Sequence, residues 1–81
     1  MSKTVKENRL FFSKYLSTVR KMHGLTQEEL AKGIGFTGTM VSHIEHNRRL
    51  PSVKFCAAMG RKFNDKHIWM GLGAAAHGWE L

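Results

Sequence analysis

The chain has 81 residues, of which 42% are apolar, and its 13 Lys and Arg against six Asp and Glu give a formal net charge of +7. This length provides one modest core and excludes a catalytic domain with a deep cleft, while a single cysteine excludes an internal disulfide and a cysteine-based zinc finger. The basic excess is typical of a protein that binds a polyanion, although a globular protein with incidental positive charge has the same composition.

The first predicted helix carries an apolar stripe in which Phe12, Leu16, Val19 and Met22 recur every three or four residues. It ends at Gly24, because glycine readily adopts the left-handed backbone that follows a helix. Helical spacing of this kind continues along the chain, and strand-like alternation does not. We therefore expect an all-α protein.

The second predicted helix begins with the strongest local signal in the sequence. Thr26 and Glu29 form a capping box, in which the threonine side chain bonds to the backbone three residues on and the glutamate reaches back. Gly33 and Gly35 end this helix after about two turns. The helix is therefore short, and a tight turn follows it.

The third predicted helix has Thr37 as its cap and runs as far as His46. Its inward stripe consists of Val41 and Ile44, and Asn47 tolerates the left-handed turn that ends it. Two short capped helices joined by a tight, glycine-containing turn are what a helix-turn-helix requires, although an ordinary αα-hairpin has the same apolar positions.

Two further helices are predicted after a basic turn. Pro51 suits the first position of the fourth helix. The apolar stripe of that helix consists of Val53, Cys56, Met59 or Gly60, and Phe63. Asp65 is expected to cap a short fifth helix that ends with Met70. The chain is thus predicted to form one domain over residues 1–71, followed by a C-terminal tail over residues 72–81.

A resemblance to a known family rests on residues 25–52, which read LTQEELAKGIGFTGTMVSHIEHNRRLPS. This stretch resembles the XRE-type helix-turn-helix family of phage repressors, which includes the lambda repressor, the Cro proteins and restriction-controller proteins. The resemblance extends over residues 15–71 and implies a compact, five-helix, lambda-repressor-like DNA-binding domain with the motif formed by helices two and three. It also implies an ion pair between Arg20, late in the first helix, and Glu45, at the end of the third.

The resemblance further implies that the third helix lies in the major groove and reads bases from its N-terminal half. The implied base-contacting residues are Gly38, Thr39, Met40 and His43. Gly38 stands where many relatives carry glutamine and offers no side chain, so Thr39 and His43 are expected to carry most of the readout. For Met40, a place at the edge of the core is the alternative.

Contacts to the DNA backbone position such a protein without reading sequence. The residues expected to make them are Gln27, Thr37, Ser42, His46, Asn47, Arg48, Arg49 and Lys54. Gln27 starts the second helix, where free backbone N–H groups favour an anion. Arg48 or Arg49 has the alternative of entering the minor groove, and each cation taken singly fits a solvated surface equally well.

Chemistry other than DNA binding finds little support in the sequence. His43 and His46 lie three residues apart on one helix face, but Cys56 is the only further ligand in view and is distant, so no metal site is predicted. Cys56 falls on an apolar stripe and suits a small core position. No nucleophile, base and orienting acid can be identified, so we expect no enzyme and no cofactor.

The predicted partner is an operator in double-stranded DNA, bound by a homodimer as a pseudo-palindrome. The dimer interface is expected at the C-terminal end, where apolar side chains exceed what a small monomer needs. These residues are Phe55, Trp69, Met70 and Trp79.

The predicted function is that of a transcription regulator, as a Cro-like or autoregulatory repressor. The alternative is an antitoxin-type module that binds a protein partner, a toxin or an antirepressor, and also represses its own operon. Nonspecific nucleic-acid binding through charge alone is a third reading. No apolar run approaches the about 20 residues of a membrane span, and the start MSKTVKENRL lacks the apolar core of a signal peptide. We expect a cytoplasmic, nucleoid-associated protein of a bacterium or phage.

Overall fold

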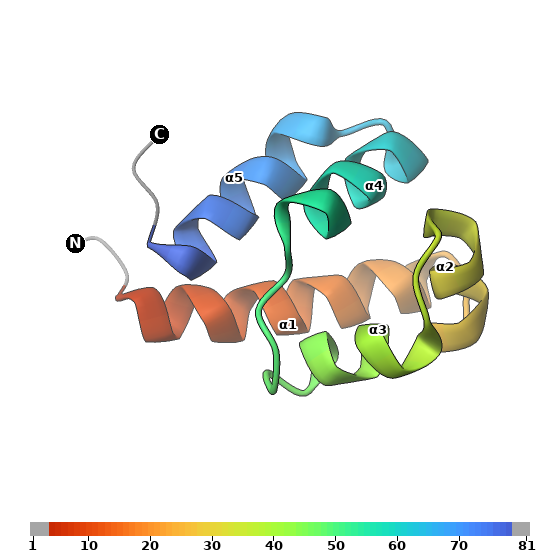
Figure 1. The fold of residues 1–81 in the computed structure, drawn as a ribbon, viewed down its shortest axis with the longest axis horizontal. Coiled ribbons are helices and arrows are strands. Elements are labelled where there is room, and N and C mark those ends of the chain that lie inside the picture. The colour runs from red at the N-terminus through yellow and green to blue at the C-terminus, as the bar shows by residue number, and fades with distance from the viewer. Residues whose placement is uncertain (1–3, 79–81) are drawn as a thin grey trace.

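The computed structural model describes residues 4–78, and within this range the chain forms α-helices and no strands (Figure 1). The helices are α1 (Val5–Met22), α2 (Gln27–Ile34), α3 (Gly38–Glu45), α4 (Val53–Phe63) and α5 (Lys66–His77). The prediction of an all-α, five-helix fold is confirmed. No helix in this part of the chain combines the length and apolar character needed to cross a bilayer.

The long helix α1 lies between the other elements (Figure 1). Helix α5 packs along one side of α1 and against α4, and α3 packs on the other side of α1. Helices α2 and α3 pack against each other, and α2 also contacts α4. The segment over residues 46–52 begins with a turn and connects the end of α3 to α4, and all five helices share one core.

Capping residues set where the first three helices begin. In α2 the backbone N–H of Glu29 donates to Thr26 Oγ1 at 3.1 Å, and the N–H of Thr26 donates to Glu29 Oε1 at 2.8 Å. Hydrogen bonds from the Thr26 backbone and hydroxyl lower the pKa of the Glu29 carboxyl. The Thr26 capping box is therefore confirmed, and Thr4 and Glu7 form a second one, at the start of α1, that we did not predict.

The end of α2 also follows from local residue chemistry. Gly35 has a φ of 77°, a left-handed conformation in which a side chain is strained, and its N–H donates to the carbonyl of Ala31. Gly33, which we expected to help end the helix, lies inside α2. Asn47 takes the predicted left-handed conformation after α3, with a φ of 57°.

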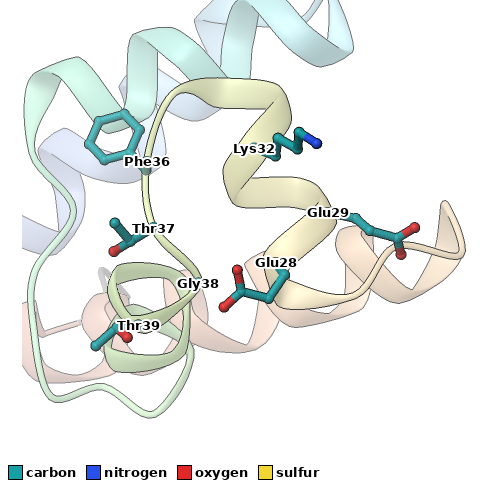
Figure 2. Close-up of a pocket in the computed structure, with 7 residues that line it drawn as sticks. All are labelled: Glu28, Glu29, Lys32, Phe36, Thr37, Gly38 and Thr39. Carbon is teal, nitrogen blue, oxygen red and sulfur yellow. The ribbon is translucent and has the colours of Figure 1, made fainter.

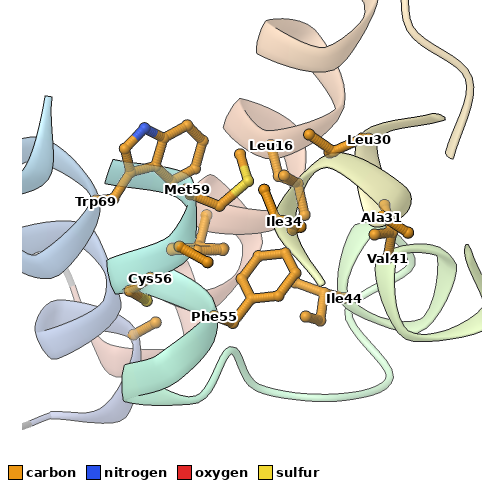
Figure 3. Packing of buried hydrophobic residues seen from close by; sticks show 13 residues of the cluster. Leu16, Leu30, Ala31, Ile34, Val41, Ile44, Phe55, Cys56, Met59 and Trp69 are labelled. Atoms are coloured by element: carbon orange, nitrogen blue, oxygen red, sulfur yellow. The ribbon is translucent and has the colours of Figure 1, made fainter. Parts of the chain in front are cut away.

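The core is built from apolar side chains of all five helices (Figure 3). Its largest fully buried members are Trp69, Phe12, Phe55, Leu16, Leu30, Ile44, Met59, Val41 and Cys56. The inward positions predicted for Val41 and Ile44 are confirmed. Met22 and Val53 were predicted to face inward and are instead exposed, because each lies at a helix end beyond the neighbouring elements.

The predictions for α4 and the dimer surface need correction at Phe55 and Trp69. Both side chains are 0% exposed in the single chain and point into the core (Figure 3), so neither forms a subunit interface. Pro51 was predicted at the first position of α4 and instead lies before the helix, because Ser52 is the cap; its hydroxyl accepts a hydrogen bond of 3.0 Å from the N–H of Phe55. With α2 and α5 both packed against it, α4 buries a wider face than the predicted stripe, and the Phe55 ring meets Phe36 edge to face at 5.2 Å.

Helix α5 is longer than predicted and includes residues 72–77, which are therefore not a tail. Asp65 stands at the N-cap position, but its side chain makes no capping hydrogen bond. Ala74 and Ala76 are buried, and a Cβ on Gly73 would collide with Sγ of Cys56. Small residues thus allow α5 to approach α4 closely.

Met70 and Trp79 complete the set of predicted interface residues. Met70 is half-buried and packs against the core, and Trp79 lies outside the described residues.

Burial raises the pKa of the Cys56 thiol to about 11, so the thiol stays protonated and packs as a small apolar group.

Candidate nucleic-acid interface

Helices α2 and α3 form a compact helix-turn-helix pair. Ala31 in α2 is buried against Val41 and Ile44 of α3, and its small side chain permits close packing of the two helices. Thr37 Oγ1 accepts a hydrogen bond of 3.2 Å from the N–H of Met40 and so caps α3. The pair therefore presents α3 as a short helix with one buried and one outward face.

A buried ion pair ties this unit to α1. Arg20 Nε lies 2.6 Å from Glu45 Oε2, and Nη2 donates to Oε1 at 3.0 Å, with side-chain exposures of 11% and 5%. The third nitrogen, Nη1, donates to the carbonyl of Leu25 at 2.8 Å. The hydrogen bond to Glu45 raises the pKa of Arg20. The pair implied by the family resemblance is present, and it joins the end of α1 to the end of α3.

Gln27, expected to contact phosphate, takes part in the same cluster. Its Nε2 donates to Glu45 Oε1 at 3.1 Å. A primary amide carries two hydrogens, so the second remains for another acceptor. Gln27 is half-buried at the start of α2. The second hydrogen of its side-chain amide therefore lies near the edge of the α2–α3 pair.

The outward face of α3 carries several of the expected contact residues. Thr39 is exposed, and Ser42 and His43 are half-exposed. Met40 is also half-buried but packs against the core, in line with the alternative considered for it. The ring of His46 folds back along the helix, and its Nδ1 bonds to the carbonyl of Ser42 at 2.8 Å.

The N-terminal end of α3 lines an open pocket together with α2 (Figure 2). The pocket is lined by Glu28, Glu29, Lys32, Phe36, Thr37, Gly38 and Thr39. Within it, Gly38 is buried, and the carboxylate of Glu28 lies over it (Figure 2). Gly38, the predicted base-contacting position that has no side chain, is thus covered by the side chain of Glu28 from α2. The sequence did not predict this contact.

A basic surface adjoins the other end of α3. Arg48 and Arg49 line a concave patch with Lys6 and Arg9 of α1, and Asn47 and Leu50 complete it. Arg9 is held there by a 3.0 Å bond from its Nε to the carbonyl of Ala76 in α5. Sequence reasoning did not assign Arg9. The signal that points to it is the capping box at Thr4, which extends α1 far enough to bring Lys6 and Arg9 beside the turn after α3.

Lys54, the remaining candidate for a backbone contact, lines neither of these two surfaces and is exposed in the first turn of α4. Among residues 4–78 no three His, Cys, Asp or Glu side chains gather as metal ligands, and Cys56 is buried in the core away from the face that carries His43.

Comparison with known proteins supports a family assignment. A family model described as a helix-turn-helix matches residues 16–68, about two-thirds of the chain. No curated protein and no solved structure matched the chain. The matched range includes α2, α3 and both partners of the Arg20–Glu45 pair.

Proposed function

Because the chain belongs to the XRE-type helix-turn-helix family, which is found in phage repressors, we propose that this DNA-binding regulator represses transcription from a pseudo-palindromic operator that it binds as a homodimer. One observation carries the proposal. The exposed face of α3 ends directly beside a patch of four cations, Lys6, Arg9, Arg48 and Arg49. A helix flanked by a basic patch suits insertion into the major groove with phosphates held at its side.

Two side chains of α3 are suited to base readout in this arrangement. Thr39 is exposed in the first turn, where it can exchange hydrogen bonds with a base edge or contact a thymine methyl group. His43 lies one turn further along and can donate to N7 or O6 of guanine. Because Met40 packs against the core, Thr39 and His43 are the principal candidates.

The cations beside α3 act differently, because phosphate contacts are independent of sequence. Replacing Arg48 with alanine is expected to weaken binding to operator and random DNA alike and to reduce the salt slope of log K by about one. Thr39→Ala and His43→Ala are expected to weaken operator binding about tenfold each and to leave random-DNA binding nearly unchanged. Mobility-shift titrations at several salt concentrations measure both effects.

A matched control is Lys14→Ala, which removes one charge from an exposed position on the face of α1 that carries Leu10 and Phe11. It is expected to change neither specific binding nor the salt slope appreciably. If all four variants changed operator and random-DNA binding by the same factor, site-specific recognition through α3 would be wrong and charge alone would account for binding.

The homodimer is a separate prediction. One short helix contacts few base pairs, so a second copy about one helical turn away is needed for useful affinity. Within residues 4–78, half-buried Met70 of α5 is the predicted interface residue that is not fully buried in the core. Sedimentation equilibrium at tens of micromolar is expected to give twice the chain mass of 9.2 kDa. A monomer that remains monomeric on operator DNA would contradict this prediction.

A further inference from the structure

The start of α3 is shaped by a pairing between a glycine and a glutamate. A Cβ added to Gly38 would collide with Oε1 of Glu28 and lie 2.6 Å from its Cδ. The backbone of Gly38 has an ordinary helical conformation, so the position does not require glycine for its dihedral angles. What the absent side chain provides is room, and the Glu28 carboxylate occupies that room.

The carboxylate of Glu28 has no binding partner of its own in the described chain. Glu28 is an exposed residue, and within residues 4–78 its carboxylate makes no hydrogen bond or salt bridge. Figure 2 shows it turned toward Gly38 and α3, whereas the neighbouring Glu29 points away toward its capping partner. Two acceptor oxygens are therefore free at the N-terminal end of the helix that meets DNA.

An acidic side chain at this place has restricted chemistry. Phosphates repel it, and the acceptors that line most of the major groove, N7 and O6 of guanine and O4 of thymine, repel it as well. Only the amino groups of cytosine and adenine donate there, and adenine places its N7 acceptor beside its amino group. A carboxylate without a competing partner is therefore matched best by N4 of cytosine.

We propose that Glu28, the second residue of α2, reads a cytosine in the major groove in place of the side chain that Gly38 lacks. This inference rests on the proposed function, since it requires α3 to lie in the groove. Its consequence is that base specificity comes from both helices of the motif. Glu28 also lowers affinity for sites without cytosine at that position, because guanine and thymine offer its charge only acceptors and adenine places an acceptor beside its amino group.

Selection of bound sequences from random double-stranded DNA tests this proposal. The wild-type protein is expected to select a half-site with one position at which cytosine is favoured over thymine by about tenfold. Glu28→Gln is expected to replace cytosine by adenine at that position only, because an amide pairs with N6 and N7 of adenine. Glu28→Ala is expected to lose the preference there and keep the rest of the half-site.

The matched control is Glu29→Gln, which removes the same charge one residue away and retains the capping box, since glutamine serves in it as glutamate does. It is expected to select the wild-type half-site. Gly38→Ala provides an independent arm: its Cβ displaces the flexible end of Glu28, so the variant is expected to fold and yet lose the cytosine preference.

The outcomes separate this proposal from the function on which it rests. If Glu28→Gln and Glu28→Ala select the wild-type base at every position, or change all positions equally, Glu28 is not a base reader, while the operator-binding function stands. If the wild-type protein itself selects no half-site, the proposed function is wrong and this inference is wrong with it.

Discussion

Replacing Trp69 with alanine is expected to lower the free energy of unfolding by about 3–5 kcal/mol, the usual cost of removing a large aromatic side chain from a core. Trp69 is fully buried and holds three helices together through ring contacts. Its ring centroid lies 5.8 Å from that of Phe12, 5.2 Å from that of Tyr15 and 6.3 Å from that of Phe63. A domain of this size has little stability to spare, so the variant is expected to be largely unfolded.

Urea denaturation followed by far-ultraviolet circular dichroism measures the effect. Ile68→Ala is the matched control, because Ile68 is the preceding residue on α5 and is 48% exposed; its cost is expected to stay below about 1 kcal/mol. Removing a side chain from a subunit interface would weaken dimerisation and leave the fold of the single chain stable. A Trp69→Ala protein that is a folded monomer of wild-type stability would therefore place Trp69 in the dimer interface and contradict the structure.

Replacing Arg20 with alanine is expected to cost about 3–5 kcal/mol, because it leaves the buried carboxylate of Glu45 without its partner. Two charge-assisted hydrogen bonds to Glu45 and one to the carbonyl of Leu25 are lost together. For a domain of this length the change corresponds to a decrease of more than about 12 °C in Tm. Thermal denaturation measures it.

Two further variants distinguish the buried pair from a general loss of charge. Lys21→Ala removes a cation from the next, exposed residue and is expected to change Tm little. The double variant Arg20→Met with Glu45→Leu is expected to recover most of the stability, because two apolar side chains leave no buried charge unpaired. If Lys21→Ala and Arg20→Ala lowered Tm equally, the Arg20–Glu45 ion pair would contribute no more to stability than an exposed charge.

The capping residues show why parts of this fold can be predicted from sequence. Thr26 and Glu29 bond across a single helical turn, and Gly35 adopts its left-handed conformation without help from distant residues. The inward positions of Val41 and Ile44 follow in turn from a helix whose start is known. These features depend on residues a few positions apart, so a sequence contains them in full.

The second half of the chain shows the limit of such reasoning. Phe55 and Trp69 looked like surplus apolar surface because the buried width of α4 and α5 depends on how many helices pack against them. The run of small residues through Ala76 looked like a tail because its apolar pattern is weak. It is a helix that packs closely against Cys56. Local patterns do not specify how many neighbours a helix has.

For the candidate interface, the sequence by itself determined the helix-turn-helix, its caps and the outward residues Thr39 and His43. Only the tertiary structure decided that Arg9 lies beside Arg48, and that Glu28 covers Gly38. The reason is the range of the contacts involved. Capping bonds close within one turn of helix, whereas a binding surface is assembled from side chains of separate helices, whose relative positions are set by the packing of the whole core.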